Sequence, residues 1–398
     1  MTEAMTADAT DRAGPGTRSI FVWFSLGHWA NDSAPGAVWI IAPAIALALD
    51  LTPGELGLLI AIHFVGAALA YFPAGVLADR VANQGRLLHL TFLWVAVGYA
   101  LGAHAPGFWT IAIMLAVAGL GDAAWHPIAT GVLVRLRPHR RAEALGIHAF
   151  GGTLAEVTAP LAMGFLLSVF DWRTALLLAC VPAALMFFAF WPVARRLPRA
   201  VGARVSGRDL LELLAHWRRP RGLGIVSMIS LYNMANLAIL AMMPLYLQRA
   251  HGFTPLEIGI AFSAMILAGA LAQPLVGRIS DQLGRRPVIL YGNLIGAAAA
   301  LLVWQLGDDT VIALAGLALT VLTLTSIRSA FLATAVDYST KRAGTTLGLA
   351  FSLLDGVGAL GAWLAGLAAN VALSHAFLLA GALALLSAVF ASRLRLTH

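Results

Sequence analysis

Long apolar runs follow one another through almost the whole chain, and short polar stretches separate them. A helix needs about 20 apolar residues to cross a bilayer, and each run is long enough for one span. We therefore expect about twelve transmembrane helices in an all-α integral membrane fold. The expected spans are 19–49, 55–79, 86–103, 108–134, 143–169 and 173–194 in the first half, and 221–248, 255–278, 287–305, 310–336, 343–369 and 373–392 in the second.

A sequence repeat relates the two halves at an offset of 202 residues. The same offset holds from the first to the fifth span of each half and pairs Asn31 with Asn233, Thr52 with Thr254, Glu55 with Glu257, Gly75 with Gly277, Asp79 with Asp281 and Gly164 with Gly366. Two copies of six spans that start on the same side predict a pseudo-two-fold axis along the membrane normal. We expect a cytoplasmic tail (1–18), an N-terminal six-helix half (19–194), a cytoplasmic linker (195–220) and a C-terminal six-helix half (221–393).

The composition agrees with a membrane protein and excludes a soluble one. The 398 residues are 60% hydrophobic and only 11% charged, whereas soluble domains carry about 25% charged residues. Residues 1–18 have no apolar core and do not resemble a signal peptide. One cysteine, Cys180, excludes an internal disulfide and a thiolate metal site. Nucleotide-binding loops and hydrolase elbows are absent from the sequence, so we expect neither an enzyme nor a bound cofactor.

The basic residues indicate how the chain is oriented. Of 26 Lys and Arg residues, all except Arg173, Arg249 and Arg328 lie in the tail, in alternate connections or at the C-terminus. The positive-inside rule then puts both termini in the cytoplasm, in the inner membrane of a bacterium. The dense Arg run at 195–221 is typical of a linker that touches anionic lipid headgroups, and nucleic acid is not an expected partner.

Two loop motifs resemble the signature of the major facilitator superfamily. One begins at Gly75 and the other at Gly277, each at the end of the second span of its half, and the residues that match are Gly75, Asp79, Arg80, Arg86, Gly277, Asp281 and Arg285. In the first copy the second glycine is displaced to Gly85, which leaves open whether Arg80 or Arg86 is the partner of the acid. The resemblance implies that these residues gate the cytoplasmic side.

Within that superfamily, three segments resemble the fosmidomycin-resistance family of exporters. They are Gly27 to Asp32 in span one, Gly119 to Pro127 in span four, and Phe150 to Gly164 in span five. The last segment is also similar to a degraded drug/proton antiporter motif, with Ala159 in place of glycine. The resemblance implies efflux of a small molecule, and hence drug resistance, by a proton-coupled antiporter. We expect the protein to be a monomer.

Ionisable side chains at membrane depth are candidates for function, because each costs about 2.5–3.5 kcal/mol to insert. Helix rise places Asp32, Asp122, Glu156 and Asp355 at one level near the midplane. A carboxyl group that is partly buried near a cation can take up and release a proton as its surroundings change. We expect these four acids to carry protons, Asp32 and Asp122 foremost, while His28 and His126 tune or relay them.

The expected substrate-binding residues lie on the same spans. Arg328 is the repeat-related position of His126, and its permanent charge suits an anionic group such as a phosphonate or carboxylate. The remaining candidates are His28, Asp32, His126, His148, Trp29, Trp125, Asn233 and Asn236. His63 is expected to be a packing residue. An uptake symporter remains an alternative, as does a path for a divalent metal or metal chelate, although no three of these residues have a recognised metal-ligand spacing.

Overall fold

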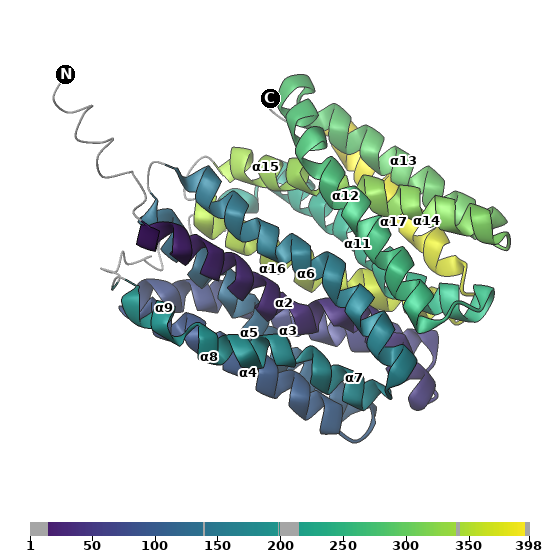
Figure 1. Cartoon of the computed structure of the whole chain (residues 1–398). Helices are drawn as coiled ribbons and strands as arrows, with labels where there is room; N and C mark the ends of the chain where they lie inside the picture. The colour runs from purple at the N-terminus through teal and green to yellow at the C-terminus, as the bar shows by residue number, and fades with distance from the viewer. Residues whose placement is uncertain (1–14, 138–139, 198, 200–214, 340–342, 395–398) are drawn as a thin grey trace.

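A computed structural model describes residues 15–137, 140–197, 199, 215–339 and 343–394. The part it describes consists of helices and short connections, and a helical segment occupies each of the twelve expected positions (Figure 1). Most of the expected tail (1–18) and of the expected linker (195–220) lies outside the described residues. The side chain of Asp79 is also outside the description.

The helices agree with the predicted spans to within a few residues. The first half contains α2 (Pro15–Ala48), α3 (Pro53–Arg80), α4 (Gln84–His104), α5 (Gly107–Leu136), α6 (Arg141–Val169), α7 (Trp172–Ala179), α8 (Val181–Ala189) and α9 (Trp191–Arg196). The second contains α11 (Pro220–His251), α12 (Pro255–Leu283), α13 (Arg285–Leu306), α14 (Thr310–Ser326), α15 (Arg328–Ser339), α16 (Ala343–Ala369) and α17 (His375–Arg393).

Eleven segments among the described residues are long and apolar enough to cross a membrane. Two of them are broken helices: α7, α8 and α9 together form the sixth span, and α14 with α15 forms the tenth. Pro182 and Pro192 stand at the starts of α8 and α9, where a missing N–H interrupts the backbone ladder. Helix α2 is not one of the eleven, and its middle carries the polar residues His28, Asn31 and Asp32.

The repeat found in the sequence is also present in the local structure. Thr52 caps α3 and bonds reciprocally with Glu55, and Thr254 caps α12 in the same way with Glu257. In each box the carboxylate accepts from the threonine backbone N–H at 2.8 Å. The equivalent helices therefore begin at equivalent residues, which supports two halves of the same design.

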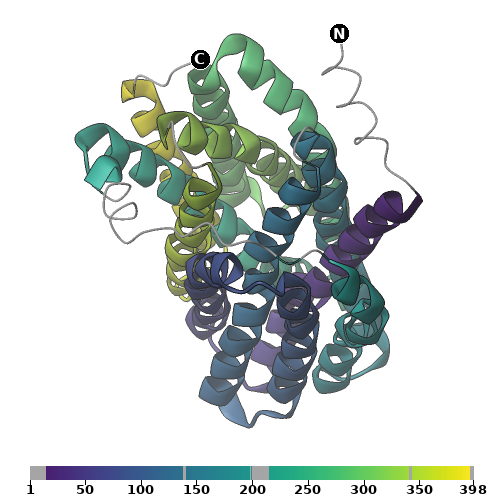
Figure 2. The ribbon, with the colours of Figure 1, turned by 90° about the vertical axis from the view of Figure 1, so that its left-hand side faces the viewer.

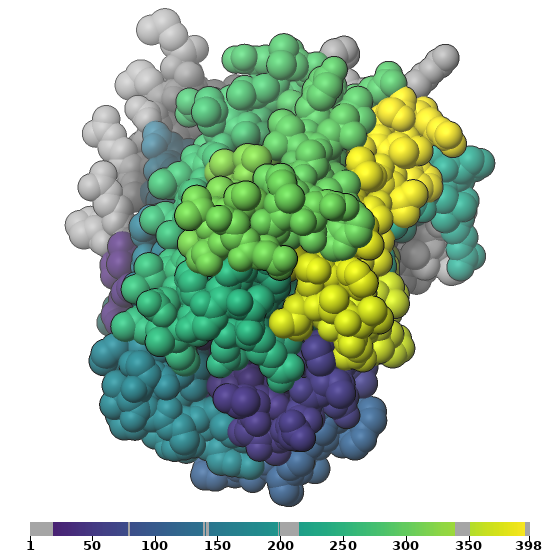
Figure 3. All heavy atoms as spheres, turned by 90° about the vertical axis from the view of Figure 1, so that its right-hand side faces the viewer, coloured from purple at the N-terminus to yellow at the C-terminus, as the bar shows by residue number. Residues whose placement is uncertain are grey.

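The two halves meet at one end of the molecule, which we call the far end because it lies opposite the ends of α9 and α17. Figure 2 looks onto the other end, the terminal end, and shows the purple to blue helices of the first half below the green to yellow helices of the second. At the far end, the spheres of the two halves meet directly (Figure 3). Four glycines make this contact close: Gly57, Gly164, Gly259 and Gly366.

These glycines lie at two helix crossings, and the sequence repeat relates one crossing to the other. A Cβ on Gly366 would lie 2.3 Å from the carbonyl oxygen of Pro53, and one on Gly164 would lie 2.5 Å from that of Pro255. The first contact joins α16 to α3, and the second joins α6 to α12. Because a real Cβ does not approach an oxygen so closely, only glycine permits the two backbones to touch here.

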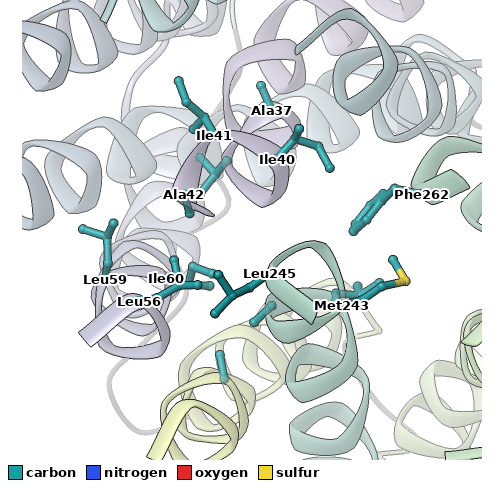
Figure 4. Close-up of a cluster of buried hydrophobic side chains, with 14 of the residues drawn as sticks. Ala37, Ile40, Ile41, Ala42, Leu56, Leu59, Ile60, Met243, Leu245 and Phe262 are labelled. Atoms are coloured by element: carbon teal, nitrogen blue, oxygen red, sulfur yellow. The ribbon is translucent and has the colours of Figure 1, made fainter. Parts of the chain in front are cut away.

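Apolar side chains from both halves pack around these crossings. Figure 4 shows Ile40, Leu56 and Ile60 of the first half close to Met243, Leu245 and Phe262 of the second. Trp39 stacks on Phe262 with ring centroids 6.3 Å apart. These side chains are almost fully buried, and we therefore describe the far end as sealed.

The signature loops at the terminal end hold each half together internally. Arg285 contacts Asp281 through a short hydrogen bond and Asp337 of α15 at 3.3 Å, all within the second half. In the first half, Arg135 donates to Gln84, whose amide donates to the carbonyl oxygen of Ala78 at 2.7 Å. Arg80 is exposed, and the backbone N–H of Arg86 bonds to Asn83. The described contacts therefore brace neighbouring helices of one half.

Candidate functional site

Ionisable side chains at mid-height of the helices retain exposed surface, which indicates a solvent-accessible cavity between the halves. The side chains of Asp32 and His126 are 20% and 24% exposed, although each lies in the middle of a long helix. Glu156 of α6 and Arg328 of the second half contact each other and are 51% and 36% exposed. Since side chains pack tightly across the far end, we interpret this exposure as a cavity that opens toward the terminal end.

His28, Asp32, His126 and His148 form one cluster on the wall of the first half. The Nε2 of His28 lies 3.1 Å from Asp32 Oδ2, and the Nε2 of His126 lies 3.9 Å from Asp32 Oδ1. The other ring nitrogen of His28, Nδ1, lies 2.9 Å from the carbonyl oxygen of His148. A carbonyl can only accept, so Nδ1 carries a hydrogen and the Nε2 of His28 faces the carboxylate.

Small residues make room for this cluster. The rings of His28 and His148 stack with centroids 4.1 Å apart, and a Cβ on Gly152 would lie 2.6 Å from the His28 ring. The Gly-Gly pair that the sequence places in span five therefore allows α6 to approach α2 at the level of the two histidines. A larger residue at position 152 would displace the His28 ring.

Asn31 connects the two acids for which we predicted the main proton-carrying role. Its amide nitrogen donates to Asp122 Oδ1 at 2.6 Å and to Asp32 Oδ1 at 3.1 Å. Asp122 is buried behind this bridge, whereas Asp32 reaches the cavity. Asn31 belongs to the motif in span one, yet sequence reasoning did not include it among the site residues.

Three of these side chains have the geometry of a candidate metal site. One ligand atom from each of His28, Asp32 and His126 can be chosen so that all lie within 4.8 Å of one another. Two imidazole nitrogens and a carboxylate oxygen suit a transition metal, and a ring N–H bonded to a carbonyl is typical of metal-bound histidine. The fold thus provides a ligand set that the sequence spacing did not indicate.

Two polar contacts cross between the halves beside this cluster. The hydroxyl of Tyr71 in α3 donates to Asp355 Oδ2 in α16 at 2.7 Å. Arg328 NH1 lies 3.7 Å from Glu156 Oε1. Tyr71 also lies beside His126, with ring centroids 6.0 Å apart. Sequence reasoning missed Tyr71, because its polar role depends on a partner almost three hundred residues away in the chain.

Other predicted residues lie away from the cavity. Trp125 is fully buried inside the first half and packs against Phe24, Phe92 and Phe190, so its side chain lines no cavity. Asn233 is buried between α11 and α16, where its amide donates to the carbonyl oxygen of Leu354. Both side chains hold helices together in this conformation, and their contact with a substrate stays a prediction.

Three further residues that we considered in the sequence are either partly exposed or buried in the packing between helices. Trp29 is partly exposed and donates from Nε1 to the hydroxyl of Thr158 at 3.0 Å, which ties α2 to α6. Asn236 is partly exposed on α11. His63 is buried, and its Nδ1 lies 3.0 Å from the carbonyl oxygen of Leu115, in agreement with its expected packing role.

The family comparison covers nearly the entire chain. Residues 24–254 and 223–398 match the model of the Major Facilitator Superfamily. A "Putative metabolite transport protein" of Haemophilus influenzae is 28% identical over 364 residues, which are 87% of this chain and 86% of the relative. An "MFS-type efflux pump" of Mycolicibacterium smegmatis is 26% identical over 302 residues, 71% of this chain and 67% of the relative.

A solved structure has the same fold. It is a bacterial homolog of the human lysosomal transporter Spinster, in an inward-facing and occupied conformation. The TM-score is 0.78 at 18% sequence identity, and the match covers 96% of this chain and 98% of that chain. At this identity the likeness extends to the arrangement of the helices.

Proposed function

Because the chain belongs to the Major Facilitator Superfamily, we propose that it is a proton-coupled secondary transporter that exports a small molecule by alternating access. The observation that carries this proposal is the linked set His28, Asp32, Asn31 and Asp122, which runs from the cavity into the first half. Protons are the expected coupling ion, and the bacterial inner membrane is the expected location.

The hydrogen bonds of the set suit a proton carrier. The Nε2 of His28 and the carboxylate of Asp32 are both acceptors when the ring is neutral, so their 3.1 Å contact requires a proton between them. Asn31 then connects this pair to a second carboxylate, Asp122. A proton taken up at one acid changes the bonding of the other through the shared amide. We assign proton carriage to Asp32 and Asp122, with Glu156 and Asp355 as further acids near the cavity.

The orientation of the chain determines which side of the membrane this conformer faces. If the positive-inside rule holds, both termini are cytoplasmic and the cavity of this conformer faces the cytoplasm. A substrate would then enter from inside the cell and leave after the halves rock about the midplane. Export is also supported by the efflux function named for the Mycolicibacterium smegmatis relative and by the resemblance of spans one, four and five to exporters.

Reconstitution into liposomes that contain a pH-sensitive dye tests the proposal. Wild type, Asp32→Asn and Asp122→Asn are compared with a panel of phosphonates, hydrophobic drugs and divalent metals. We expect at least one compound to elicit proton movement in wild type that both variants lose. Substrate transport that is equal in all three proteins and moves no protons would overturn the coupling. Substrate-driven proton entry that accompanies uptake would instead indicate a symporter.

A second candidate function is transport of a divalent metal or metal chelate, which the ligand geometry of His28, Asp32 and His126 favours. Zn²⁺ or Co²⁺ supplied alone in the same liposomes distinguishes it from the first. Metal uptake that His126→Ala abolishes, without any response to the organic compounds, would favour this function over export of a small molecule.

A further inference from the structure

A break in the tenth span places Arg328 at the cavity. Helix α14 ends at Ser326 and α15 starts at Arg328, with Ile327 between them. In a continuous α-helix the N–H of residue 328 would donate to the carbonyl oxygen of Leu324. Here that oxygen accepts a hydrogen bond from the hydroxyl of Tyr232 at 2.6 Å. Arg328 is therefore the first residue of a new helix, in the middle of the membrane-spanning segment.

The break contains no proline, and hydroxyl side chains bond to backbone carbonyl groups beside it. Thr323 Oγ1 bonds to the carbonyl oxygen of Leu319 at 2.8 Å, and Ser326 Oγ bonds to that of Thr323 at 3.1 Å. Such back-bonding competes with the backbone ladder and bends helices. Arg328 is thus positioned by its own segment and by Tyr232 of α11.

The ion pair of Arg328 is loose. Its NH1 lies 3.7 Å from Glu156 Oε1, which is longer than a hydrogen bond, and both side chains reach solvent. A guanidinium has five N–H donors in a plane and matches the two oxygens of a carboxylate, phosphonate or sulfonate at about 2.7–2.9 Å. The pair therefore leaves room for a closer anion on Arg328.

We propose that Arg328 is the subsite for an anionic group of the substrate, and that this group replaces the carboxylate of Glu156 on the guanidinium. The proposal rests on the transport function proposed above and names its substrate class, which is a small organic carboxylate, phosphonate or sulfonate. Glu156 acts as the internal anion that occupies Arg328 when the cavity contains no substrate.

The exchange has a consequence for the contact between the halves. Arg328 belongs to the second half and Glu156 to the first, so their pair crosses the cavity. An anion that takes the place of Glu156 releases the carboxylate, which lies among the charges of His28, Asp32 and Asp355. Binding thus changes both the link between the halves and the charge beside the proton-carrying cluster. A neutral compound of the same shape offers no such exchange.

Binding of matched probes to the purified full-length protein tests the exchange without any pH gradient. The probes are phenylphosphonate and benzoate, with benzamide as the neutral analogue and benzylamine as the cation, and calorimetry gives the affinity of each. We expect Glu156→Gln to bind the two anions at least about tenfold more tightly than wild type, because the competitor is gone. Arg328→Gln should lose this binding, and Arg328→Lys should weaken it, because an ammonium cannot form the paired contact.

Glu143→Gln is the matched control, because Glu143 is an exposed acid on the same helix that pairs with Arg140. Glu143→Gln should bind every probe with the same affinity as wild type. The affinity for benzamide should be the same in wild type and in all variants. Unchanged or weaker anion binding in Glu156→Gln overturns the proposal, and so does anion binding that survives in Arg328→Gln. Absence of anion binding in both wild type and Glu156→Gln overturns it as well. If Arg328→Gln does not fold, Arg328→Lys and Glu156→Gln still decide.

The two proposals fail separately. If the Arg328 and Glu156 variants change anion binding as expected, but the Asp32 and Asp122 variants still move protons like wild type, the anion subsite is supported and the proposed proton coupling is wrong. The reverse result would retain the coupling and reject the subsite.

Discussion

Gly366 lies against Pro53 so closely that a methyl group on the glycine would stand 2.3 Å from the proline carbonyl oxygen. This contact joins α16 of the second half to α3 of the first at the sealed far end. Its repeat-related counterpart is the contact of Gly164 with Pro255. The seal therefore depends on backbone atoms that only glycine brings together.

We expect Gly366→Ala to shift the protein toward a conformer that is open at the far end. The added methyl group must be relieved by separation of α3 and α16, and overpacking of this kind costs about 1–3 kcal/mol. Spin labels on cysteines placed at the exposed far-end residues Asp50 and Asp308, in a Cys180→Ser background, should report a longer distance in the variant. Gly146→Ala is the control, since a Cβ at Gly146 would meet no atom within 4 Å. An unchanged distance in Gly366→Ala would show that the seal tolerates the methyl group.

Tyr71→Phe removes a hydrogen bond between the halves without changing the shape of the side chain. The Tyr71 hydroxyl donates a hydrogen bond to Asp355 at 2.7 Å. A hydrogen bond to a charged group contributes about 1.5–3 kcal/mol to stability. We expect a lower melting temperature for the variant in detergent. A double-mutant cycle with Asp355→Asn isolates the pair, and a coupling energy near zero would mean that the contact contributes nothing to the sealed conformer.

Trp125→Ala separates a packing role from a substrate role. The side chain is fully buried among Phe24, Phe92 and Phe190, so truncation should cost about 3–5 kcal/mol of stability. Trp125→Phe should recover most of the loss and retain transport. If Trp125→Phe melts like wild type but does not transport, the indole would have a direct functional role that this conformer does not reveal.

Asp171, at the far end of the first half, makes a pH-dependent contribution to the stability of the folded protein. It caps α7, and hydrogen bonds from the hydroxyl and backbone N–H of Thr174 hold the pKa of this carboxyl below its usual range. A lowered pKa in the folded state means that the contribution is present above the ordinary aspartate pKa and is lost as pH falls through the lowered value. Asp171→Ala should therefore reduce the melting temperature at neutral pH and have a smaller effect in acid.

The Asp171→Asn variant tests whether this carboxyl group causes the loss of stability in acid. Asp171→Asn retains a capping oxygen but does not titrate, so its melting temperature should depend less on pH than that of wild type. A steeper acid dependence in the asparagine variant would contradict the assignment of the effect to this carboxyl group.

The sequence predicts the spans well because hydropathy is a local property. Helices occupy all twelve expected positions, and eleven of them are long and apolar enough to cross a membrane. The capping boxes at Thr52 and Thr254 are local signals of the same kind. The break before Arg328 was not predicted, because it contains neither proline nor glycine and depends on Tyr232, which is 92 residues from Leu324 in the chain.

The candidate site was predicted in part, for the same reason. His28 and Asp32 are four residues apart on one helix, so their contact follows from helix geometry alone. The contacts of Tyr71 with Asp355 and of Glu156 with Arg328 join different halves, and no local pattern indicates them. Trp125 was assigned to the cavity because its neighbours are polar, but its own position on α5 points into the packed interior.

His126 and Arg328 occupy the same place in two copies of one design. One copy holds a ring whose charge depends on pH, and the other holds a cation whose charge does not. Two copies of the first half, paired with each other, would have titratable groups but no permanent cation between them. Two copies of the second half would have the cation and would lack the histidine and aspartate cluster. The two halves of the duplicated fold have thus diverged in the charged groups they carry. A dimer made of either half alone would lack the groups that the other half supplies.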